Sequence, residues 1–357
     1  MSTRFEKLYV TNIKKLTEDC VAISLEIPTA LKQAFSYIQG QYITVKKTIE
    51  NQEVRRSYSI CSSPLENSFT IAVKKIEGGI FSTYANTHLK VGDCLEVMAP
   101  KGKFFTLLNS NNKKRYVAIA AGSGITPIIS IIKTTLLTEP NSHFILVFGN
   151  KNSRSIIFRE ELENLKNKFT NRLSIIHILS RENTDSPIHF GRINEDKCSL
   201  LFGKLVPLHA DEYFICGPQE MIFSVKSFLE QNQVDANKIH YELFAAVKGK
   251  QIDNATNTIV NDQRTSKIHI TIDGRTISFQ LQYNHLSILD AALQNGADLP
   301  FACKGGVCCT CKAKLVNGNV TMHNNYALEQ EEIQQGYILT CQATPTTETV
   351  TINFDEK

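Results

Sequence analysis

The spacing of apolar and polar residues changes along the chain and separates three stretches of different texture. Between about Phe5 and Phe105, short runs alternate apolar and polar positions, which is the period of half-buried strands. Turn signals such as Gly40, Gly78–Gly79 and Gly92–Asp93 separate these runs. Many short strands at this spacing predict an antiparallel barrel or sandwich. The expected strands are Ala22–Ile27, Tyr42–Val45, Tyr58–Cys61, Phe69–Val73 and Cys94–Met98.

From Arg115 onward, continuous apolar runs alternate with segments of helical period. This alternation predicts an α/β domain with a doubly wound parallel sheet. The expected strands are Tyr116–Ala120, Phe144–Phe148, Leu173–Leu179 and Glu212–Cys216. The expected helices are Pro127–Leu137, Phe158–Lys168 and Glu220–Asn232.

The third stretch follows a polar segment, Lys248–Ser266, which has few apolar residues and is interpreted as a linker between domains. Two strand-like runs, Lys267–Ile272 and Arg275–Gln280, flank Asp273–Gly274, a two-residue sequence that favours a hairpin turn. Ser287 then stands three residues before Asp290, which is the spacing of a helix N-cap. A helix is therefore expected to begin there and to end near Asn295–Gly296.

The composition narrows the class of protein. The 357 residues are 42% hydrophobic and 21% charged, as in ordinary globular proteins, and the net charge is only +4. The basic run Lys113–Arg115 is interpreted as a solvated loop, so we expect no nucleic-acid partner. The N-terminal residues carry scattered charges, and the longest apolar stretch, Ile125–Ile132, is too short to span a bilayer. We therefore expect a cytoplasmic protein with no membrane partner, whose ten cysteines are not paired in disulfides.

The sequence CKGGVCCTC contains the most specific signal in the chain. Cys303, Cys308 and Cys311 have C-x4-C-x2-C spacing, and Cys341 follows after 29 further residues. This is the ligand spacing of a plant-type [2Fe–2S] cluster, in which one tight loop supplies three thiolates and a distant segment the fourth. The glycines within the loop suit a backbone that turns sharply and donates N–H groups to sulfur.

Two other interpretations of these cysteines are weighed. A structural zinc site more often uses two C-x2-C pairs, which this arrangement does not supply. Inert buried thiols would not need this spacing, whereas the spacing, the glycines and the preceding hairpin and helix all agree with iron and sulfur. Cys309 adjoins a ligand, so its side chain should point elsewhere and pack, or else serve as a substitute ligand. The isolated cysteines are expected to be small buried hydrophobic residues: Cys20, Cys61, Cys94 and Cys198.

A glycine-containing turn, AAGSGITP, follows the first buried strand of the α/β domain and begins a helix. Such a turn lets backbone N–H groups approach a phosphate at the positive end of the helix. The third glycine of the usual dinucleotide fingerprint is replaced by Pro127, which disfavours a standard Rossmann site. Four further short motifs occur in succession along the chain, and four motifs in this order are not plausibly a coincidence. They are Arg56–Ser59, Gly78–Ser82, Ser180–Glu182 and Cys216–Pro218.

With these motifs, the chain resembles the ferredoxin–NADP reductase superfamily with a plant-type ferredoxin of β-grasp fold at the C-terminus. Within this superfamily, the chain is most similar to the reductase components of phenylacetyl-CoA epoxidases. The stretches that carry this resemblance are RRSYSICSSP, GGIFSTYANTHL, IIFREEL, CGPQEMI and CKGGVCCTC. The resemblance implies a flavin-binding barrel over 1–110, a pyridine-nucleotide domain over 111–247, a linker over 248–266 and a [2Fe–2S] domain over 267–357.

The resemblance also implies roles for individual residues around the flavin. Arg56 would neutralise the flavin pyrophosphate, Tyr58 would stack on the isoalloxazine, and Ser59 would hydrogen-bond near N5. Gly79 and Ser82 would hold the pyrophosphate at a helix start. The implied flavin is FAD, because MAPKG (98–102) and the adjoining KF (103–104) look like the FAD-binding members, and FMN is the alternative.

For the pyridine nucleotide, the resemblance implies that Gly122, Gly124 and Thr126 bind phosphates. Cys216 and Gly217 would line the nicotinamide side of the hydride path. Ser180 and Arg181 match a Ser-Arg pair that grips the 2′-phosphate in the superfamily, which favours NADPH over NADH. Against this, Glu182 is adjacent and Arg181 could pair with a surface carboxylate instead.

These groups together suggest an order of electron transfer. NAD(P)H delivers two electrons as hydride and an iron–sulfur centre accepts one at a time, so a flavin belongs between them. Tyr58, Ser59 and Cys216 are the residues expected nearest this chemistry, and His88 and His240 are interpreted as structural. The expected acceptor is an oxygenase, in particular a phenylacetyl-CoA epoxidase. The alternatives are a Rieske oxygenase, a steroid hydroxylase or a hybrid-cluster protein, or a non-catalytic redox sensor or zinc-binding protein.

Overall fold

The computed structural model describes residues 4–184, 186–244, 264–283 and 285–356. The chain forms two compact units, Met1–Phe244 and Ala245–Lys357. Most of the predicted linker, Lys248–Ser266, lies outside the described residues, and a strand already begins at Thr265.

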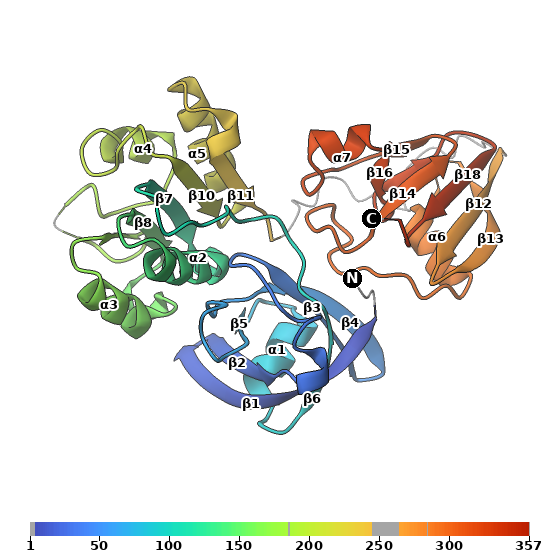
Figure 1. Cartoon of the computed structure of the whole chain (residues 1–357), viewed down its shortest axis with the longest axis horizontal. Coiled ribbons are helices and arrows are strands. Elements are labelled where there is room, and N and C mark those ends of the chain that lie inside the picture. The colour runs from blue at the N-terminus through green and yellow to red at the C-terminus, as the bar shows by residue number, and fades with distance from the viewer. Residues whose placement is uncertain (1–3, 185, 245–263, 284, 357) are drawn as a thin grey trace. The chain divides into compact units, whose positions relative to one another are not determined.

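The first unit begins with a six-stranded antiparallel sheet in the order β4-β3-β6-β1-β2-β5 (Figure 1). An isolated bridge between Ile60 and Ile71 links the two end strands, so the sheet curls into a barrel. Inward-facing side chains such as Ile43, Val45 and Leu95 form its core. The elements are β1 (Phe5–Thr17), β2 (Cys20–Glu26), β3 (Tyr42–Ile49), β4 (Gln52–Ser59), β5 (Thr70–Lys74), α1 (Ile80–Thr87) and β6 (Cys94–Met98).

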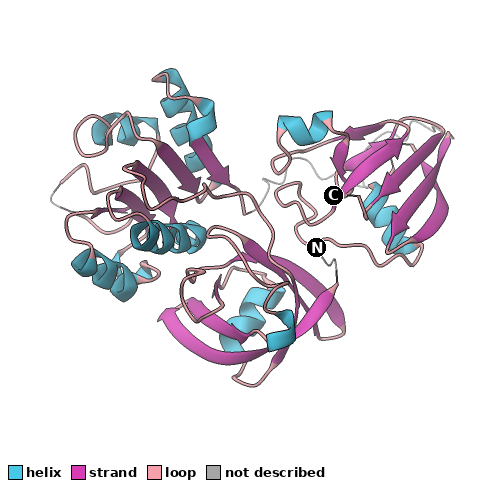
Figure 2. Cartoon of the chain, in the orientation of Figure 1, coloured by secondary structure: helices cyan, strands magenta, loops and turns pink. Residues whose placement is uncertain are grey.

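The same unit continues into a five-stranded parallel sheet in the order β11-β10-β7-β8-β9. Figure 2 shows helices on either side of these strands, as expected for a doubly wound domain. The strands are β7 (Arg115–Ala121), β8 (His143–Asn150), β9 (Leu173–Leu179), β10 (Glu212–Cys216) and β11 (Ile239–Glu242). The helices are α2 (Ile125–Thr138), α3 (Arg159–Lys168), α4 (Glu195–Leu201) and α5 (Gln219–Gln231).

Helix α2 joins the barrel to the parallel sheet. Its residues from Ile125 to Leu136 are all buried, because one side packs on the sheet and the other on the barrel. Polar contacts fix the barrel side: the Ser130 hydroxyl donates to the Ser62 carbonyl at 2.6 Å, and the hydroxyls of Ser63 and Thr134 are 2.9 Å apart. Pro127 fits in the first turn because an N–H there has no partner within the helix.

The second unit contains a five-stranded mixed sheet in the order β13-β12-β18-β14-β16, with a separate β15–β17 pair. The predicted hairpin is present, and Asp273 and Gly274 have the positive φ angles, 49° and 71°, that its tight turn requires. Ser287 caps the predicted helix by accepting a hydrogen bond from the Asp290 N–H. The elements are β12 (Thr265–Ile272), β13 (Arg275–Gln282), α6 (Ile288–Gln294), β14 (Lys312–Asn317), β15 (Val320–Met322), α7 (Gln330–Gln334), β16 (Tyr337–Leu339), β17 (Ala343–Pro345) and β18 (Thr349–Asn353).

Candidate redox site

The residues expected to hold a flavin lie on β4 and at the start of α1. Arg56 is exposed on β4, and its guanidinium donates to the Arg55 carbonyl at 2.8 Å. The Tyr58 ring packs on Phe81 of α1 with 5.5 Å between ring centroids and a tilt of 38°. Burial raises the pKa of Tyr58, so the phenol stays neutral. Strand and helix therefore present a cation and an aromatic ring together, as a flavin site requires.

The start of α1 depends on the absence of a side chain at Gly79. A Cβ there would lie 2.3 Å from the Ser82 Oγ and 2.5 Å from the Ile76 Cγ1. The Ser82 hydroxyl accepts from the Ile76 N–H at 3.3 Å and donates to the Gly79 carbonyl at 3.2 Å. Ser82 is thus already hydrogen-bonded within the turn, whereas no side chain caps the first N–H groups of α1. These N–H groups are the donors that suit a phosphate.

The turn between β7 and α2 uses its two glycines for different reasons. Gly122 has a φ of +54°, and a Cβ there would meet open space. A Cβ on Gly124, in contrast, would lie 2.0 Å from the Cys216 carbonyl oxygen and 2.7 Å from the Gly217 nitrogen. Gly124 therefore allows α2 to begin directly against the end of β10. The buried Thr126 hydroxyl donates to the Ser123 carbonyl at 3.0 Å and stabilises the turn itself.

A carboxyl group that the sequence analysis missed, Glu242, lies beside Ser59 and Cys216. It is the last residue of β11 and pairs in parallel register with Cys216 of β10. The Ser59 hydroxyl donates to its Oε2 at 3.4 Å. Burial raises the pKa of Glu242 to about 8, although the Ser59 hydrogen bond acts in the opposite direction. Barrel and parallel sheet thus bring two expected residues and one unexpected acid to the same place.

Cys216 itself is fully buried, and burial, together with the nearby Glu242, raises the pKa of its thiol well above the usual range. It is therefore a neutral group and not a thiolate nucleophile. The adjoining Gly217 is tightly packed, since a Cβ there would lie 2.7 Å from the Met221 Cε. The two histidines interpreted as structural are hydrogen-bonded locally: His88 to the Thr87 hydroxyl at 2.7 Å and His240 to Glu212 at 2.9 Å.

Ser180 and Arg181 directly follow β9 and lie beside the segment that follows β8. Both segments are at the carboxyl edge of the sheet, where this type of fold binds ligands. The Ser180 N–H donates to the Asn150 carbonyl, and the Arg181 N–H to the Lys151 carbonyl. Arg181 is exposed, and within the described part of the chain it has no ion pair. The carboxylate of Glu182 accepts from Ser153 and not from Arg181.

In the second unit, the four predicted cluster ligands lie together. The Cys308 thiol donates to the Cys303 sulfur at 3.1 Å, and Cys341 interacts with both Cys303 and Cys311. Because the four thiols hydrogen-bond to one another, the pKa is lowered for Cys303 and Cys311 and raised for their donors Cys308 and Cys341. Among the described residues, no group of three His, Cys, Asp or Glu side chains has the arrangement of ligands around one metal ion. A [2Fe–2S] cluster does not require this arrangement, because its four thiolates are divided between two irons.

The loop around these sulfurs has the backbone that the cluster spacing predicts. Gly306 has a φ of +76°, and a Cβ there would lie 2.7 Å from the Asn324 carbonyl oxygen, so both conformation and space require glycine. The Gly305 N–H donates to the Cys303 sulfur at 3.4 Å. Cys309 points away, with its thiol 3.1 Å from the Ala327 carbonyl. The donor set and the loop fit a [2Fe–2S] cluster held by Cys303, Cys308, Cys311 and Cys341.

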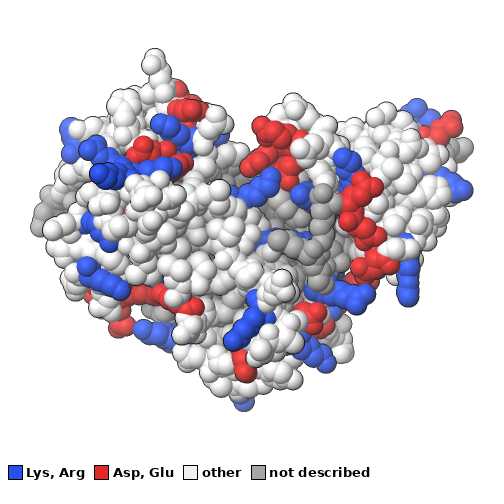
Figure 3. Space-filling model, viewed as in Figure 1, with Lys and Arg blue, Asp and Glu red and all other residues white. Residues whose placement is uncertain are grey.

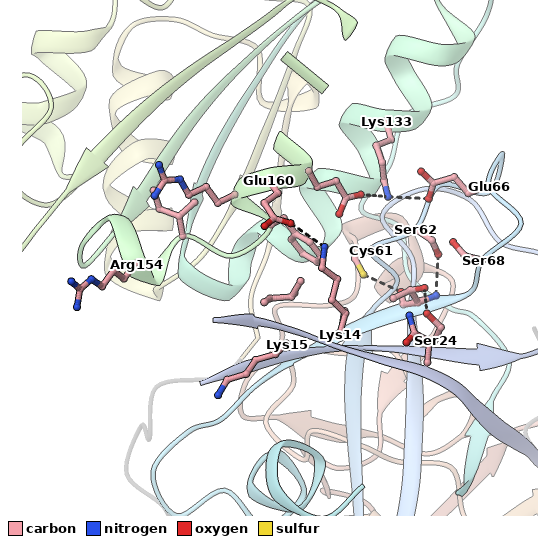
Figure 4. Close-up of a pocket in the computed structure, with 18 of the residues that line it drawn as sticks. Lys14, Lys15, Ser24, Cys61, Ser62, Glu66, Ser68, Lys133, Arg154 and Glu160 are labelled. Carbon is pink, nitrogen blue, oxygen red and sulfur yellow. Dashed lines mark hydrogen bonds and ion pairs between the residues drawn. The ribbon is translucent and has the colours of Figure 1, made fainter. Parts of the chain in front are cut away.

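A separate polar cleft of about 530 Å³ lies between the barrel and α2–α3 (Figure 4). Lys133 is buried above it and pairs with Glu66 and Glu161, at 2.9 Å each, while Lys14 pairs with Glu160 at 3.2 Å. None of the predicted flavin or nucleotide residues lines this cleft. Through its two ion pairs, Lys133 of α2 links Glu66 of the barrel to Glu161 of α3.

On the face shown in Figure 3, Lys and Arg side chains are interspersed with Asp and Glu side chains. No helix among the described residues is both long enough and apolar enough to cross a membrane.

Three family models match successive parts of the chain. The oxidoreductase FAD-binding domain matches residues 7–106, the oxidoreductase NAD-binding domain matches 118–227, and the 2Fe-2S iron-sulfur cluster binding domain matches 270–346. These three matches follow the order of the barrel, the parallel sheet and the cysteine loop.

Similar proteins share the whole arrangement. The chain is 43% identical over 356 residues to one of the subunits of 1,2-phenylacetyl-CoA epoxidase of Escherichia coli K12, a match that covers 99% of both chains. It is 32% identical to the ferredoxin reductase component of 3-ketosteroid-9-alpha-monooxygenase of Mycobacterium tuberculosis H37Rv, over 90% of this chain and 86% of that one. The fold matches phthalate dioxygenase reductase with a TM-score of 0.59 and 23% identity over 98% of both chains. The chain belongs to the ferredoxin–NADP reductase superfamily, among the oxidoreductases that carry a C-terminal [2Fe–2S] domain.

Proposed function

We propose that this protein transfers electrons from NADPH through FAD to its [2Fe–2S] cluster and on to an oxygenase that epoxidises phenylacetyl-CoA. The observation that carries the choice of oxygenase is the identity of 43% over 99% of both chains with the protein of the Escherichia coli epoxidase. An identity that extends over every domain covers the surface of the cluster domain as well as the flavin site. Acceptor choice depends on that surface.

The proposed domains are a flavin barrel over 1–110, a nucleotide domain over 111–247, a linker over 248–266 and a cluster domain over 267–357. In the barrel, Arg56 would hold the flavin pyrophosphate together with the open N–H groups in the first turn of α1, which follows Gly79 and contains Ser82. In the nucleotide domain, Gly122, Gly124 and Thr126 would shape the phosphate turn. Ser180 and Arg181 would bind the 2′-phosphate.

The chain's own residues would act mainly by positioning. When bound, the flavin supplies the conversion of a two-electron hydride donor into single electrons for the cluster. Tyr58 offers a neutral, half-buried ring for stacking, and Ser59 offers a hydroxyl whose present partner is Glu242 at 3.4 Å. Cys216 and Gly217 would close the nicotinamide side with a neutral, buried thiol and a tightly packed glycine, which excludes water. Glu242, protonated below pH of about 8, can hold a proton next to Ser59.

Reconstitution tests the proposed acceptor. The full chain, purified without air, is mixed with the oxygenase components of phenylacetyl-CoA epoxidase, substrate and NADPH, and the epoxide is quantified. A parallel mixture contains a Rieske-type oxygenase, which is one of the alternative acceptors. The proposal predicts coupled product formation with the epoxidase and little with the Rieske enzyme; the reverse result would contradict it.

A simpler assay separates electron transfer from the alternative of a redox sensor or zinc-binding protein. Steady reduction of ferricyanide by NADPH requires only the flavin, whereas a non-catalytic protein would show a single turnover at most. We expect steady turnover in a buffer free of thiols, which would reduce ferricyanide directly, and we propose the cytoplasm as the protein's location. A protein that contains zinc and no iron, and that does not oxidise NADPH, would overturn the proposed function as a whole.

A further inference from the structure

The two segments that follow β8 and β9 are fastened to each other at the carboxyl edge of the parallel sheet. The Ser180 N–H donates to the Asn150 carbonyl at 2.9 Å, and the Arg181 N–H donates to the Lys151 carbonyl at 2.8 Å. The strands themselves are neighbours, with Asn150 opposite Leu179. Lys151 and Arg181 therefore begin side by side, at the edge of the sheet where doubly wound domains bind their ligands.

The acidic residue next to Arg181 is committed to a different partner. The Oε2 of Glu182 accepts from the Ser153 N–H at 2.7 Å and from the Ser153 hydroxyl at 2.9 Å. The backbone N–H of Ser153, followed by its hydroxyl, lowers the pKa of this carboxyl, so it stays ionised. Glu182 thus forms a third link between the two segments. Because it is engaged there, it is poorly placed to accept hydrogen bonds from the ribose hydroxyls of NADH.

Each of these two segments carries an exposed cation. Lys151 and Arg181 are both exposed, and neither has an ion pair within the residues that the structure describes. Two like charges on hydrogen-bonded neighbouring segments repel each other, and a dianion between them would relieve that repulsion. A phosphate monoester carries about −1.5 to −2 charges at neutral pH and suits both an Arg fork and a Lys point charge.

We propose that Lys151 is a second cation for the 2′-phosphate of NADPH, acting with Arg181, and that the Ser153–Glu182 pair is the positioning element that holds the two segments together. This inference rests on the proposed use of a pyridine nucleotide and names the residues that select between its two forms. NADH lacks the phosphate, so Lys151 contributes to NADPH and not to NADH.

The test compares two nucleotide fragments, so that it does not depend on turnover. Calorimetry measures the affinity of the full-length holoprotein for 2′,5′-ADP, which carries the 2′-phosphate, and for 5′-AMP, which lacks it. The variant Lys151→Ala should bind 2′,5′-ADP about fivefold more weakly, as expected for an exposed ion pair, and Arg181→Ala about tenfold or more. Neither variant should change the affinity for 5′-AMP. Lys151→Arg should restore the affinity because it keeps the charge.

Arg154 provides a matched control. It is an exposed cation three residues further along the same segment, but it lies at the rim of the cleft between the barrel and α2–α3 (Figure 4). Arg154→Ala also removes one positive charge. If this variant loses as much affinity for 2′,5′-ADP as Lys151→Ala does, the effect comes from the overall electrostatic potential of the segment, and the role of Lys151 is overturned. A wild-type protein that binds 2′,5′-ADP no more tightly than 5′-AMP would overturn it too.

Steady-state kinetics gives the second readout and separates this inference from the proposed function. With ferricyanide as acceptor, Lys151→Ala should raise the KM for NADPH and leave kcat and all NADH parameters near wild-type values. Equal changes for both nucleotides would contradict the inference. If the wild type oxidises neither nucleotide, the proposed function fails, while the comparison of the two fragments still decides whether Lys151 binds a 2′-phosphate.

Discussion

Replacing Gly124 by Ala should displace the nicotinamide side of the site, because the added methyl group meets backbone that cannot rotate away. Its Cβ would lie 2.0 Å from the Cys216 oxygen, 2.4 Å from the Cys216 carbon and 2.7 Å from the Gly217 nitrogen. Real Cβ atoms essentially never approach another atom closer than 3.0 Å, so α2 and the end of β10 must separate by 3.0 minus 2.0, or 1.0 Å, at the nearest contact. Both are buried and packed on the same sheet.

The cost follows from this overlap. Forced overpacking of a filled interior typically costs about 1–3 kcal/mol, and each kcal/mol lowers the melting temperature of a unit of this size by about 2–4 °C. A displacement of about 1 Å at a reacting centre can reduce a rate by about 10²-fold. We therefore expect Gly124→Ala to melt at a lower temperature and to reduce its flavin with NADPH far more slowly.

Gly122→Ala is the control, because that position has a positive φ but open space around it. It should lose stability through the left-handed backbone, about 1–2 kcal/mol, without moving Cys216. Circular dichroism gives the melting temperatures, and anaerobic stopped-flow absorbance gives the rate of flavin reduction. If Gly124→Ala reduces its flavin as fast as the wild type does at saturating NADPH, the close approach of α2 to β10 does not position the nicotinamide and our reasoning is wrong.

Three other predictions concern separate parts of the chain. Glu242 has a folded-state pKa of about 8 against an ordinary value of 4.5, so the folded state holds a proton that the unfolded state has lost, and stability should fall as pH rises from about 4.5 to 8. Glu242→Gln should lose this slope in melting temperature against pH; an unchanged slope would assign it to another group. Cys309→Ser should keep its iron and sulfide content, because the Cys309 thiol faces the Ala327 carbonyl, and loss of iron would show that Cys309 is a ligand. Chromatography of the extracted flavin beside standards should show FAD, and FMN alone would refute that choice.

Much of the fold could be predicted because the relevant signals are local. Strands β9 and β10 and the hairpin turn at Asp273–Gly274 were expected at the positions where they occur, since short apolar runs and turn residues suffice to define them. The prediction for the barrel was less accurate: Tyr58–Cys61 was expected as a strand, whereas β4 spans Gln52–Ser59. The first part of this strand contains charged residues, including Arg55 and Arg56, and its burial does not alternate residue by residue, so the sequence pattern does not reveal it.

The candidate site shows the same limit. The four proposed cluster ligands could be identified from the sequence because three of them fall within nine residues, at the spacing of plant-type [2Fe–2S] ligands. The sequence gave no sign of the role of Glu242, because β11 has only four residues. The neighbours of the Glu242 carboxyl group come from the pairing of β11 with β10, in which Glu242 lies opposite Cys216, 26 positions earlier in the chain (242 minus 216). Likewise, the sequence does not distinguish the two glycines of the phosphate turn. Only the structure shows that Gly124 is needed for the close contact with β10, whereas Gly122 is needed for its positive φ.

The most direct measurement of the central claim is low-temperature EPR of the protein after anaerobic reduction with NADPH. We predict that the wild type develops the signal of a reduced [2Fe–2S] cluster. Cys341→Ser, which removes the one ligand outside the CKGGVCCTC loop, should lose that signal while its flavin is still bound and still reduced by NADPH. If Cys341→Ser keeps the signal, or if protein isolated without air contains stoichiometric zinc and no iron, the proposed path of electrons is wrong.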